Sequence, residues 1–353
     1  MDYDILHVVG ARPNFAKMAP VYKSLSKLRV SQKILHSGQH YDKNMSGDFF
    51  KDLGIPDPDI TLKIKGKTHA EQTSDVMIGI EKELSKSLPK IVCVYGDINT
   101  TLAATISSKK MNTKVAHIES GLRSGDIHMP EEQNRIMVDA ISDFHFVTEK
   151  SGVDHLKEAG KTASVYHVGN TMIDSLSEYL RQNPRKKSEK YGVATFHRPS
   201  NVDSKEGILE VLSILEGINI KTYWPMHPRT MSSLKKFRCL SRAKRIKNLS
   251  MIEPLPYNSF INLVNNSTMV ITDSGGIQEE TTYMGIPCIT YRSSTERPAT
   301  ITTGSNVLTM NKHEILNYTK DIMLGTFKKG KIPHLWDGRS GERIALILKR
   351  KLL

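Results

Sequence analysis

Carboxylates follow three predicted element boundaries in the first half of the chain. Asp97 follows the apolar run at 91–95 with one residue, Gly96, between them, Glu119 follows the run at 115–118, and Glu131 opens the next predicted helix. Because the carboxyl ends of parallel strands meet at one edge of a sheet, we expect these side chains to gather there. Like charges brought together raise each other's pKa, which suits a carboxylate to general acid or base catalysis near neutral pH. Taken singly, each residue fits a helix cap or an ion pair better than a catalytic role.

Two histidines occupy equivalent positions in the second half of the chain. His197 directly follows the apolar run at 191–196, and His227 directly follows the run at 222–226. A histidine titrates near neutral pH and exchanges protons readily, so both residues are candidates for acid-base chemistry opposite the carboxylates. A loop histidine with satisfied hydrogen bonds is the simpler interpretation of each one alone.

A strand-to-helix junction in the second half has the pattern of an anion site. Ser274, Gly275 and Gly276 follow a short apolar run, and the spacing predicts a helix over 277–284. We expect the glycines to turn tightly and to let backbone N–H groups approach a ligand at the helix N-terminus. Glu280 would repel a phosphate there, but it can accept hydrogen bonds from the hydroxyls of an attached sugar. A nucleotide sugar uses both features, and a tight turn with surface carboxylates fits the pattern equally well.

Cations replace the glycine fingerprint of dinucleotide enzymes after the first strand. Segment 10–17 lacks the glycine spacing that close approach to a pyrophosphate requires, which disfavours a nicotinamide cofactor. Arg12 and Lys17 can instead neutralise a diphosphate, and Arg297 can clamp a phosphate oxygen. Ordinary surface cations are the alternative. The histidines show no zinc-ligand spacing, so we expect no essential metal and no cofactor.

The order of predicted elements indicates an α/β protein with two domains. Short apolar runs alternate with helical patterns, which predicts parallel sheets covered by helices on both faces. A second series of strands and helices begins near residue 170, so we place a first domain at 1–169 and a second at 170–340, and the last segment, 341–353, can cross back to the first. Ligands of open α/β sheets bind beyond the strand carboxyl ends, so two such domains would enclose a cleft.

Composition narrows the class of protein. The 353 residues carry a formal net charge of +13, but the basic residues fall in local clusters with little aromatic interleaving. This disfavours a nucleic-acid partner and favours solvated basic faces that attract an anionic substrate. No apolar run is long enough for a membrane span and the first residues do not resemble a signal peptide, so we expect a cytoplasmic protein. The three cysteines are far apart and predict core packing.

Several motifs in a fixed order resemble one family, the bacterial and archaeal non-hydrolysing UDP-N-acetylglucosamine 2-epimerases. They include Gly10-Ala11-Arg12-Pro13, Gly38-Gln39-His40, Gly96-Asp97-Ile98-Asn99, His117-Ile118-Glu119-Ser120-Gly121, Met129-Pro130-Glu131-Glu132-Gln133-Asn134-Arg135, His197-Arg198, the segment 272–280 and Thr295-Glu296-Arg297-Pro298. The resemblance extends from the first strand to about residue 300 and continues at 337–341. It implies two Rossmann-like domains in the GT-B arrangement, a nucleotide sugar bound in the interdomain cleft, a homodimer and no redox cofactor.

The resemblance also implies roles for individual residues. Asp97, Glu119 and Glu131 match the family's catalytic carboxylates and His197 its catalytic histidine, with acid and base left open. The match also implies substrate-binding positions, which are Arg12, Lys17, Phe260, Ser274, Gly276, Glu280 and Arg297. The residue pattern adds His227 and Gly275 as substrate-binding candidates.

The implied reaction inverts carbon 2 of UDP-N-acetylglucosamine to give UDP-N-acetylmannosamine for surface polysaccharide synthesis. UDP is eliminated to give 2-acetamidoglucal and then added back with the proton delivered to the opposite face. A hydrolysing epimerase, an epimerase of a diacetamido-uronic acid sugar, a GT-B glycosyltransferase and a basic binding module without catalysis are the alternatives. Pro199-Ser200-Asn201 and Leu255 depart from common family residues, which leaves the preferred amino sugar and any allosteric site open.

Overall fold

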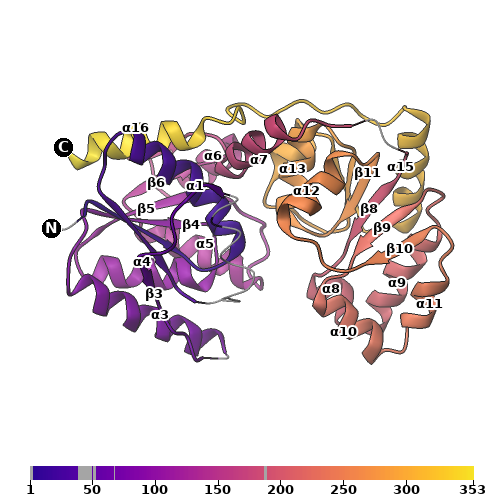
Figure 1. The fold of residues 1–353 in the computed structure, drawn as a ribbon, viewed down its shortest axis with the longest axis horizontal. Helices are drawn as coiled ribbons and strands as arrows, with labels where there is room; N and C mark the ends of the chain where they lie inside the picture. The colour runs from indigo at the N-terminus through magenta and orange to yellow at the C-terminus, as the bar shows by residue number, and fades with distance from the viewer. Residues whose placement is uncertain (1–2, 39–49, 51–52, 67, 187–188) are drawn as a thin grey trace. The chain divides into compact units, whose positions relative to one another are not determined.

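The chain forms two compact α/β units. The computed structural model describes residues 3–38, 50, 53–66, 68–186 and 189–353 (Figure 1). The first unit comprises Met1–Glu178 and His334–Leu353, and the second comprises Tyr179–Pro333. Within the described residues, no helix is both long and apolar enough to cross a membrane.

The first unit is built on a seven-stranded parallel sheet in the order β3-β2-β1-β4-β5-β6-β7. Its strands are β1 Ile5–Val9, β2 Gln32–His36, β3 Ile60–Thr61, β4 Ile91–Tyr95, β5 Lys114–Ser120, β6 Phe144–Val147 and β7 Val165–His167. The central strands β1 and β4 are buried along their whole length, as the near-continuous apolar runs of a parallel sheet require.

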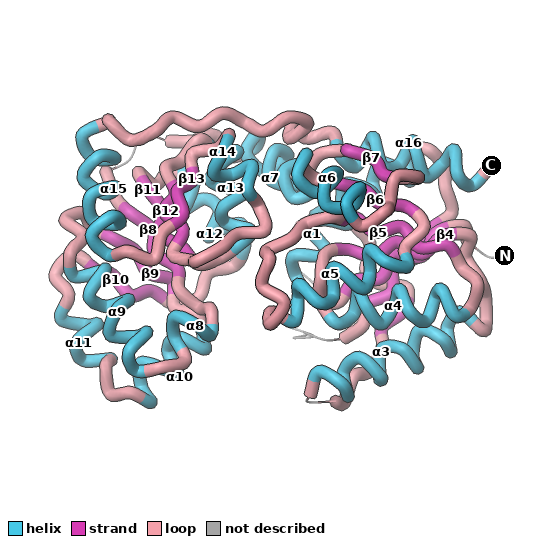
Figure 2. Tube along the Cα trace, turned by 180° about the vertical axis from the view of Figure 1, so that it is seen from behind, coloured by secondary structure: helices cyan, strands magenta, loops and turns pink. Residues whose placement is uncertain are grey.

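Helices cover both faces of this sheet (Figure 2). They are α1 Arg12–Lys27, α3 His69–Leu84, α4 Asn99–Lys110, α5 Pro130–Ile141, α6 Lys150–Glu158 and α16 Ser340–Leu352. The helix α7 Thr171–Gln182 begins in the first unit and ends in the second. Alternate residues of β1 separate the two faces. Ile5 packs in the core with α1 and α16, whereas Leu6 packs in the core with α3 and α4. The C-terminal helix α16 therefore completes the core of the first unit.

The second unit repeats the plan with a six-stranded parallel sheet in the order β10-β9-β8-β11-β12-β13. Its strands are β8 Gly192–Thr195, β9 Thr222–Pro225, β10 Leu249–Ile252, β11 Met269–Thr272, β12 Cys288–Thr290 and β13 Asn306–Leu308. Its helices are α8 Pro199–Val202, α9 Lys205–Glu216, α10 Pro228–Lys236, α11 Leu240–Arg245, α12 Tyr257–Asn265, α13 Gly275–Met284, α14 Pro298–Thr302 and α15 Lys312–Leu324.

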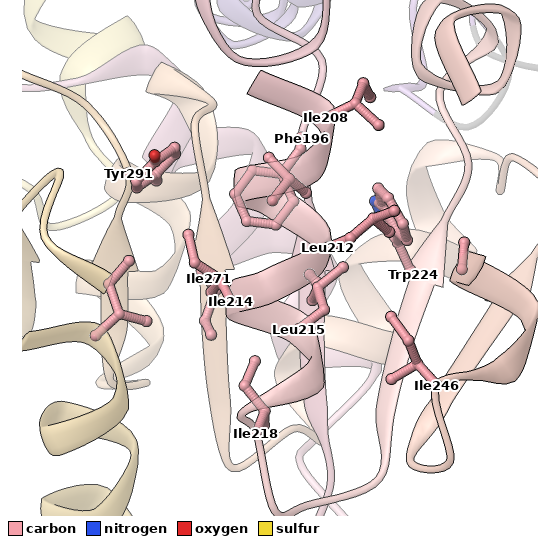
Figure 3. Packing of buried hydrophobic residues seen from close by; sticks show 14 of the residues in the cluster. Phe196, Ile208, Leu212, Ile214, Leu215, Ile218, Trp224, Ile246, Ile271 and Tyr291 are labelled. Carbon is pink, nitrogen blue, oxygen red and sulfur yellow. The ribbon is translucent and has the colours of Figure 1, made fainter. Parts of the chain in front are cut away.

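The larger core of the second unit lies between its sheet and α9, α10 and α15. Figure 3 shows Phe196 and Trp224 within it. Their rings pack edge to face, with centroids 6.2 Å apart. Ile271 faces this core, and its neighbour Val270 faces the opposite core with α12 and α13. Burial of these two apolar faces fixes the register of β11, and hence the residue at which the polar segment after it begins.

The predicted fold class, two Rossmann-like α/β domains with parallel sheets, is confirmed. The three cysteines are free and buried, as their apolar surroundings indicate. Two boundaries of single strands or helices differ from prediction. Glu119 belongs to β5 rather than to the loop after it, and α13 begins at Gly275 rather than at residue 277, so its glycines are helical instead of forming a tight turn.

Candidate functional site

In the first unit, the two strand-end carboxylates lie on adjacent strands. β4 pairs with β5 in parallel, with Tyr95 opposite Ile118, and the N–H of Gly96 donates a hydrogen bond to the carbonyl of Ile118 at 3.0 Å. Asp97, just after β4, and Glu119, near the end of β5, therefore lie at neighbouring points on one edge of the sheet. The structure brings these two candidates together as the strand pattern predicts.

Glu119 lies at an irregularity in β5. The pairing of β5 with β6 shifts between Ile118 and Ser120, and Glu119 has φ 72°, in the left-handed region that a residue with a side chain rarely occupies. A bulge re-aims the side chain it carries. Strain of this kind persists where the surrounding structure holds it, and it is concentrated at functional sites.

Lys17 from α1 reaches the same place. Its ammonium group forms an ion pair with the carboxylate of Glu119, and both side chains are buried. Gly96 makes room for this approach, since a Cβ atom there would lie 3.0 Å from the Lys17 Nζ. Lys17 thus offsets the charge of the buried Glu119 carboxylate beside the Gly96 backbone, one residue before Asp97.

Arg135 from α5 connects Asp97 to the loop that precedes that helix. Its Nη1 lies 2.5 Å from Asp97 Oδ2, and its Nη2 lies 2.5 Å from Glu132 Oε2. Glu132 in turn accepts hydrogen bonds from the backbone N–H groups of Ser124 and Gly125. Burial acts to raise the pKa of Glu132, but the hydrogen bonds from Ser124 and Arg135 outweigh it and the pKa is lowered.

Glu131 has a different environment from its neighbour. It is exposed in the first turn of α5, whereas Glu132 is 2% exposed. A carboxylate in the first turn is stabilised by the helix dipole, and exposure leaves it accessible to a ligand. The side chain of the remaining first-unit candidate, Arg12, lies outside the described residues, although its backbone begins α1. Residues Gln39 and His40 of the quoted motif also lie outside them.

In the second unit, His197 is held by a buried aspartate. β8 and β11 pair in parallel with Thr195 opposite Thr272, so the residues that follow these strands are neighbours. The Nδ1 of His197 lies 3.0 Å from Oδ1 of Asp273. Asp273 is fully buried and also accepts hydrogen bonds from the backbone N–H groups of His197 and Arg198 and from the Asn201 side chain.

These contacts fix the charge of Asp273 and the orientation of His197. Burial alone would raise the pKa of Asp273, but hydrogen bonds from His197, Arg198 and Asn201 lower it below its usual value. A carboxylate on Nδ1 holds the imidazole in the tautomer whose Nε2 can accept a proton. The His197 side chain is 36% exposed, so the ring remains accessible.

His227 lies beside His197, with ring centroids 5.1 Å apart. Its Nδ1 accepts a hydrogen bond from the Arg229 backbone N–H at 3.2 Å and caps the N-terminus of α10. Partial burial lowers the pKa of His227, and the nearby His197 and Arg229 lower it further. A neutral His227 with its proton on Nε2 is therefore a hydrogen-bond donor near neutral pH.

The N-terminus of α13 carries the predicted anion site. Ser274 is the N-cap residue and makes no side-chain capping hydrogen bond. A Cβ atom at Gly275 would lie 2.6 Å from Arg297 Nη1, so the absence of a side chain lets the guanidinium approach the helix end. A Cβ at Gly276 would meet nothing within 4 Å. One glycine therefore admits Arg297, and the other leaves open space at a helix N-terminus, where backbone N–H groups favour anions.

Arg297 is part of a buried charge network. Its guanidinium pairs with Glu279, at 2.9 Å, and with Glu296. Glu296 also pairs with Arg292 at 2.9 Å. The pairing explains why Glu279 is tolerated near a predicted phosphate site, because Arg297 balances its charge.

Glu280 is buried one turn into α13 and accepts a hydrogen bond from the Tyr257 hydroxyl at 2.9 Å. Burial raises the pKa of Glu280 to about 8; the Tyr257 hydrogen bond opposes this rise and the charge of Glu279 adds to it. Phe260, half-buried on α12, packs against the same small core as Ile277. A carboxyl group with an aromatic neighbour can bind the hydroxyls of a sugar, as predicted for Glu280.

Sequence patterns missed several of these partners. Asp273 stands inside the quoted 272–280 motif, but its contact with His197 depends on strand order. Arg135 and Glu132 stand in the quoted 129–135 motif, and only their burial distinguishes them from Glu131. No sequence pattern indicated the contact of Tyr257 with Glu280. Among the described residues, no cluster of three or more His, Cys, Asp or Glu side chains is placed to hold a metal ion.

The fold is that of two Rossmann-like units, with ionisable side chains near the ends of parallel strands in both and open space at a helix N-terminus in the second. Residues 23–349 match the model of the UDP-N-acetylglucosamine 2-epimerase family. The chain belongs to this family of isomerases, which confirms the resemblance drawn from its motifs.

Similar proteins include enzymes and a solved structure. The chain is 38% identical to the UDP-N-acetylglucosamine 2-epimerase of Methanocaldococcus jannaschii, with 97% of each chain covered. It is 36% identical to the UDP-2,3-diacetamido-2,3-dideoxy-D-glucuronate 2-epimerase of Pseudomonas aeruginosa, covering 98% of this chain and 99% of that one. The crystal structure of the M. jannaschii enzyme in complex with UDP-GlcNAc and UDP has a TM-score of 0.90, covering 98% of this chain and 99% of that one at 36% identity.

Proposed function

We propose that this protein is a non-hydrolysing epimerase that interconverts UDP-N-acetylglucosamine and UDP-N-acetylmannosamine by inversion at carbon 2. The observation that carries the proposal is the family match over residues 23–349. The polar groups described above supply what such a reaction needs, namely acid-base residues and a site for a nucleoside diphosphate.

The proposed route has two halves. A base removes the proton from carbon 2 while the bond between carbon 1 and the UDP oxygen breaks, and the electron pair of that bond leaves with UDP. The product is 2-acetamidoglucal, with a double bond between carbons 1 and 2. UDP then adds back through its oxygen to carbon 1, and an acid delivers a proton to the opposite face of carbon 2. The route avoids simple deprotonation at a carbon that is not next to a carbonyl.

The first unit supplies the candidate carboxylates of this route. Asp97, Glu119 and Glu131 serve in proton transfer, and Lys17 stabilises the negative charge near Glu119. The buried position of Glu119 and its ion pair with Lys17 support this assignment, because a carboxylate with a fixed partner is held in one orientation.

The second unit supplies the nucleotide site and the histidine. The N-terminus of α13 and Arg297 bind the diphosphate, and Glu280 accepts hydroxyl hydrogen bonds from the ribose. The open space at Gly276 supports the phosphate assignment. His197, oriented by Asp273, exchanges a proton with the substrate. Turnover then depends on residues of both units.

The test is proton NMR of the purified protein with UDP-N-acetylglucosamine in deuterated water, without added metal or nicotinamide. We expect UDP-N-acetylmannosamine to appear with deuterium at carbon 2, because the proton delivered comes from solvent. Accumulation of free N-acetylmannosamine and UDP would show a hydrolysing enzyme instead. An absence of change without an acceptor sugar, followed by sugar transfer when one is added, would show a glycosyltransferase.

A second candidate substrate is the corresponding diacetamido-uronic acid sugar nucleotide. The P. aeruginosa relative that acts on such a sugar, by its name, is 36% identical to this chain, against 38% for the M. jannaschii relative. The same NMR assay with both sugars decides between them through the ratio of the two kcat/KM values. We also expect a homodimer and a role in supplying surface polysaccharide synthesis, and light scattering on the purified protein tests the first.

A further inference from the structure

A buried aspartate outside the groups described above connects the two strand-end carboxylates of the first unit. Asp139 lies on α5 and is 2% exposed. Its carboxylate accepts hydrogen bonds from the Ser120 hydroxyl at 2.5 Å, the Gly121 N–H at 3.1 Å and the Arg123 guanidinium at 2.7 Å. The Nδ1 of His117 lies 2.7 Å from the same carboxylate.

These four donors surround Glu119 in the sequence. His117 stands two residues before it, and Ser120 and Gly121 follow it directly. Glu119 itself has φ 72°, and Gly121 has φ 82°. Backbone in this region is stable only where neighbouring contacts hold it. Asp139 therefore fixes the chain on both sides of the strained residue that carries the candidate catalytic carboxylate.

His117 extends the network to Asp97. Its Nε2 lies 2.9 Å from the carbonyl oxygen of Gly96, the residue before Asp97. Both ring nitrogens of His117 thus face oxygen acceptors, one a carboxylate and the other a carbonyl. Both can donate only if the ring carries two N–H hydrogens, as an imidazolium whose charge Asp139 balances.

The remaining neighbours agree with this charge distribution. Burial acts to raise the pKa of Asp139, but the hydrogen bond and charge of His117 and the charge of Arg123 hold it well below its usual range. His145 lies 3.0 Å from the Ser120 hydroxyl, and burial lowers its pKa to about 4, which leaves it neutral. The ionised Asp139 is therefore matched by His117 and Arg123.

We propose that Asp139 is a positioning residue for the reaction, which sets the places of Asp97 and Glu119 through His117 and through the Ser120-Gly121 backbone. This inference rests on the proposed function, since it assigns Asp139 a part in that reaction. A purely structural role is the alternative, because removing one partner of a buried ion pair leaves an uncompensated charge and destabilises the unit. The two roles differ in what the loss of the carboxylate does to turnover at unchanged folding.

The experiment compares Asp139→Asn with Asp143→Asn in the full-length protein. Asp143 accepts the Val115 N–H at 2.7 Å and pairs with Lys109, so it supports the opposite end of the same strand β5. Melting temperature, kcat, KM and UDP affinity are measured for both variants. We expect kcat of Asp139→Asn to fall by at least about tenfold, since a displacement near 1 Å at a reacting group is enough for that. We expect UDP affinity to stay within about twofold, because the α13 N-terminus and Arg297, to which the proposal assigns the diphosphate, lie in the other unit.

The control separates positioning from stability. Asp143→Asn should lower the melting temperature without a matching loss of kcat. Equal kcat losses in the two variants, or wild-type kcat in folded Asp139→Asn, would overturn the proposal.

A readout independent of turnover keeps this inference distinct from the proposed function. Nitrogen-15 NMR of the histidine rings should show His117 with both nitrogens protonated in the wild-type protein and singly protonated in Asp139→Asn. A neutral His117 in the wild type would overturn the network even if the enzyme is an epimerase. Absence of epimerase activity in a wild type whose His117 is an imidazolium would overturn the positioning role and the proposed function together, while leaving the ion pair itself intact.

Discussion

The Nδ1 of His197 lies 3.0 Å from Oδ1 of Asp273, where two neighbouring parallel strands of the second unit end. The aspartate is fully buried and ionised, and the histidine is partly exposed. A carboxylate in this position fixes the ring orientation and the tautomer, so Nε2 is the nitrogen that exchanges a proton with a ligand.

Replacement of Asp273 should therefore disable His197 without removing it. We expect Asp273→Asn to lower kcat on the order of a hundredfold or more, because the ring loses its fixed tautomer and the stabilisation of its charged form. UDP affinity, measured by calorimetry, should change much less than kcat. The matched control is Asp203→Asn, which removes a half-exposed carboxylate 3.9 Å from Arg229 in the same unit and should leave kcat unchanged. Wild-type kcat in a folded Asp273→Asn variant would show that the pair is structural only.

The second prediction concerns turnover by variants of Asp97 and Glu119, the strand-end carboxylates of the first unit. Asp97→Asn and Glu119→Gln should each lower kcat by at least about a hundredfold if the residues transfer protons. Glu83→Gln is the control, since it removes an ion pair with Lys86 on the surface of α3. Single-turnover rates in deuterated water, followed by loss of the carbon 2 proton, measure the step directly. Normal rates for both variants would remove the carboxylates from the mechanism.

Two neighbouring glutamates on α5 should respond in opposite ways. Glu131 is exposed, so Glu131→Gln should lower kcat with little change in melting temperature. Glu132 is buried against Arg135, and its loss leaves that cation without a full partner. We expect Glu132→Gln to lower the free energy of unfolding by about 1–3 kcal/mol. Thermal denaturation and steady-state kinetics on both variants separate the effects, and a stability loss at Glu131 without a kinetic one would contradict the assignment.

Sequence patterns located the strands better than the contacts between them. The bounds of β1 and β4 match the apolar runs at 5–9 and 91–95, because a strand buried on both faces is apolar throughout. The helix α4 escaped notice, since its Thr and Ser residues are buried and it has no polar face to produce a helical period.

Residues of the candidate site could be predicted only where their type and their position after an apolar run indicated a function. The carboxylates, the histidines and the glycines of the anion site could be named from their positions after apolar runs. The partner of His197 could not, because Asp273 follows β11, the third strand after β8 in the chain and its neighbour in the sheet. The left-handed backbone of Glu119 was equally invisible, since no glycine marks it.

Replacement by alanine should have different effects on stability at the two glycines that begin α13. At Gly275 a Cβ would lie 2.6 Å from Arg297 Nη1, so Gly275→Ala should displace the guanidinium, lower the melting temperature and weaken UDP binding. At Gly276 a Cβ has open space, so Gly276→Ala should keep or raise the melting temperature, because alanine favours a helix by roughly 1 kcal/mol over glycine. It should still weaken UDP binding, since the methyl group occupies the proposed phosphate site. Unchanged UDP affinity in Gly276→Ala would move that site elsewhere.

Because the carboxyl group of Glu280 is buried, we expect the stability of the folded protein to fall as the pH rises. Its pKa in the folded protein is about 8, above the ordinary value of 4.5, so the folded state binds more protons than the unfolded state between these values. Stability from this group is therefore fully present below about pH 4.5 and is lost as the pH rises toward 8. We expect Glu280→Gln to gain stability relative to the wild type across this range, by on the order of a few kcal/mol at the upper end.

Chemical denaturation of both proteins at several pH values between about 5 and 9 measures this difference. Glu216 provides the control, because a hydrogen bond from Arg242 lowers its pKa in the folded protein. A lowered pKa contributes stability that is lost only as the pH falls below the ordinary value, so Glu216→Gln should differ from the wild type by a constant amount over the same range. A constant difference for Glu280→Gln as well would mean that Glu280 is ionised in the folded protein at neutral pH. Its carboxylate would then accept hydroxyl hydrogen bonds without first losing a proton, and UDP affinity would not depend on pH through this residue.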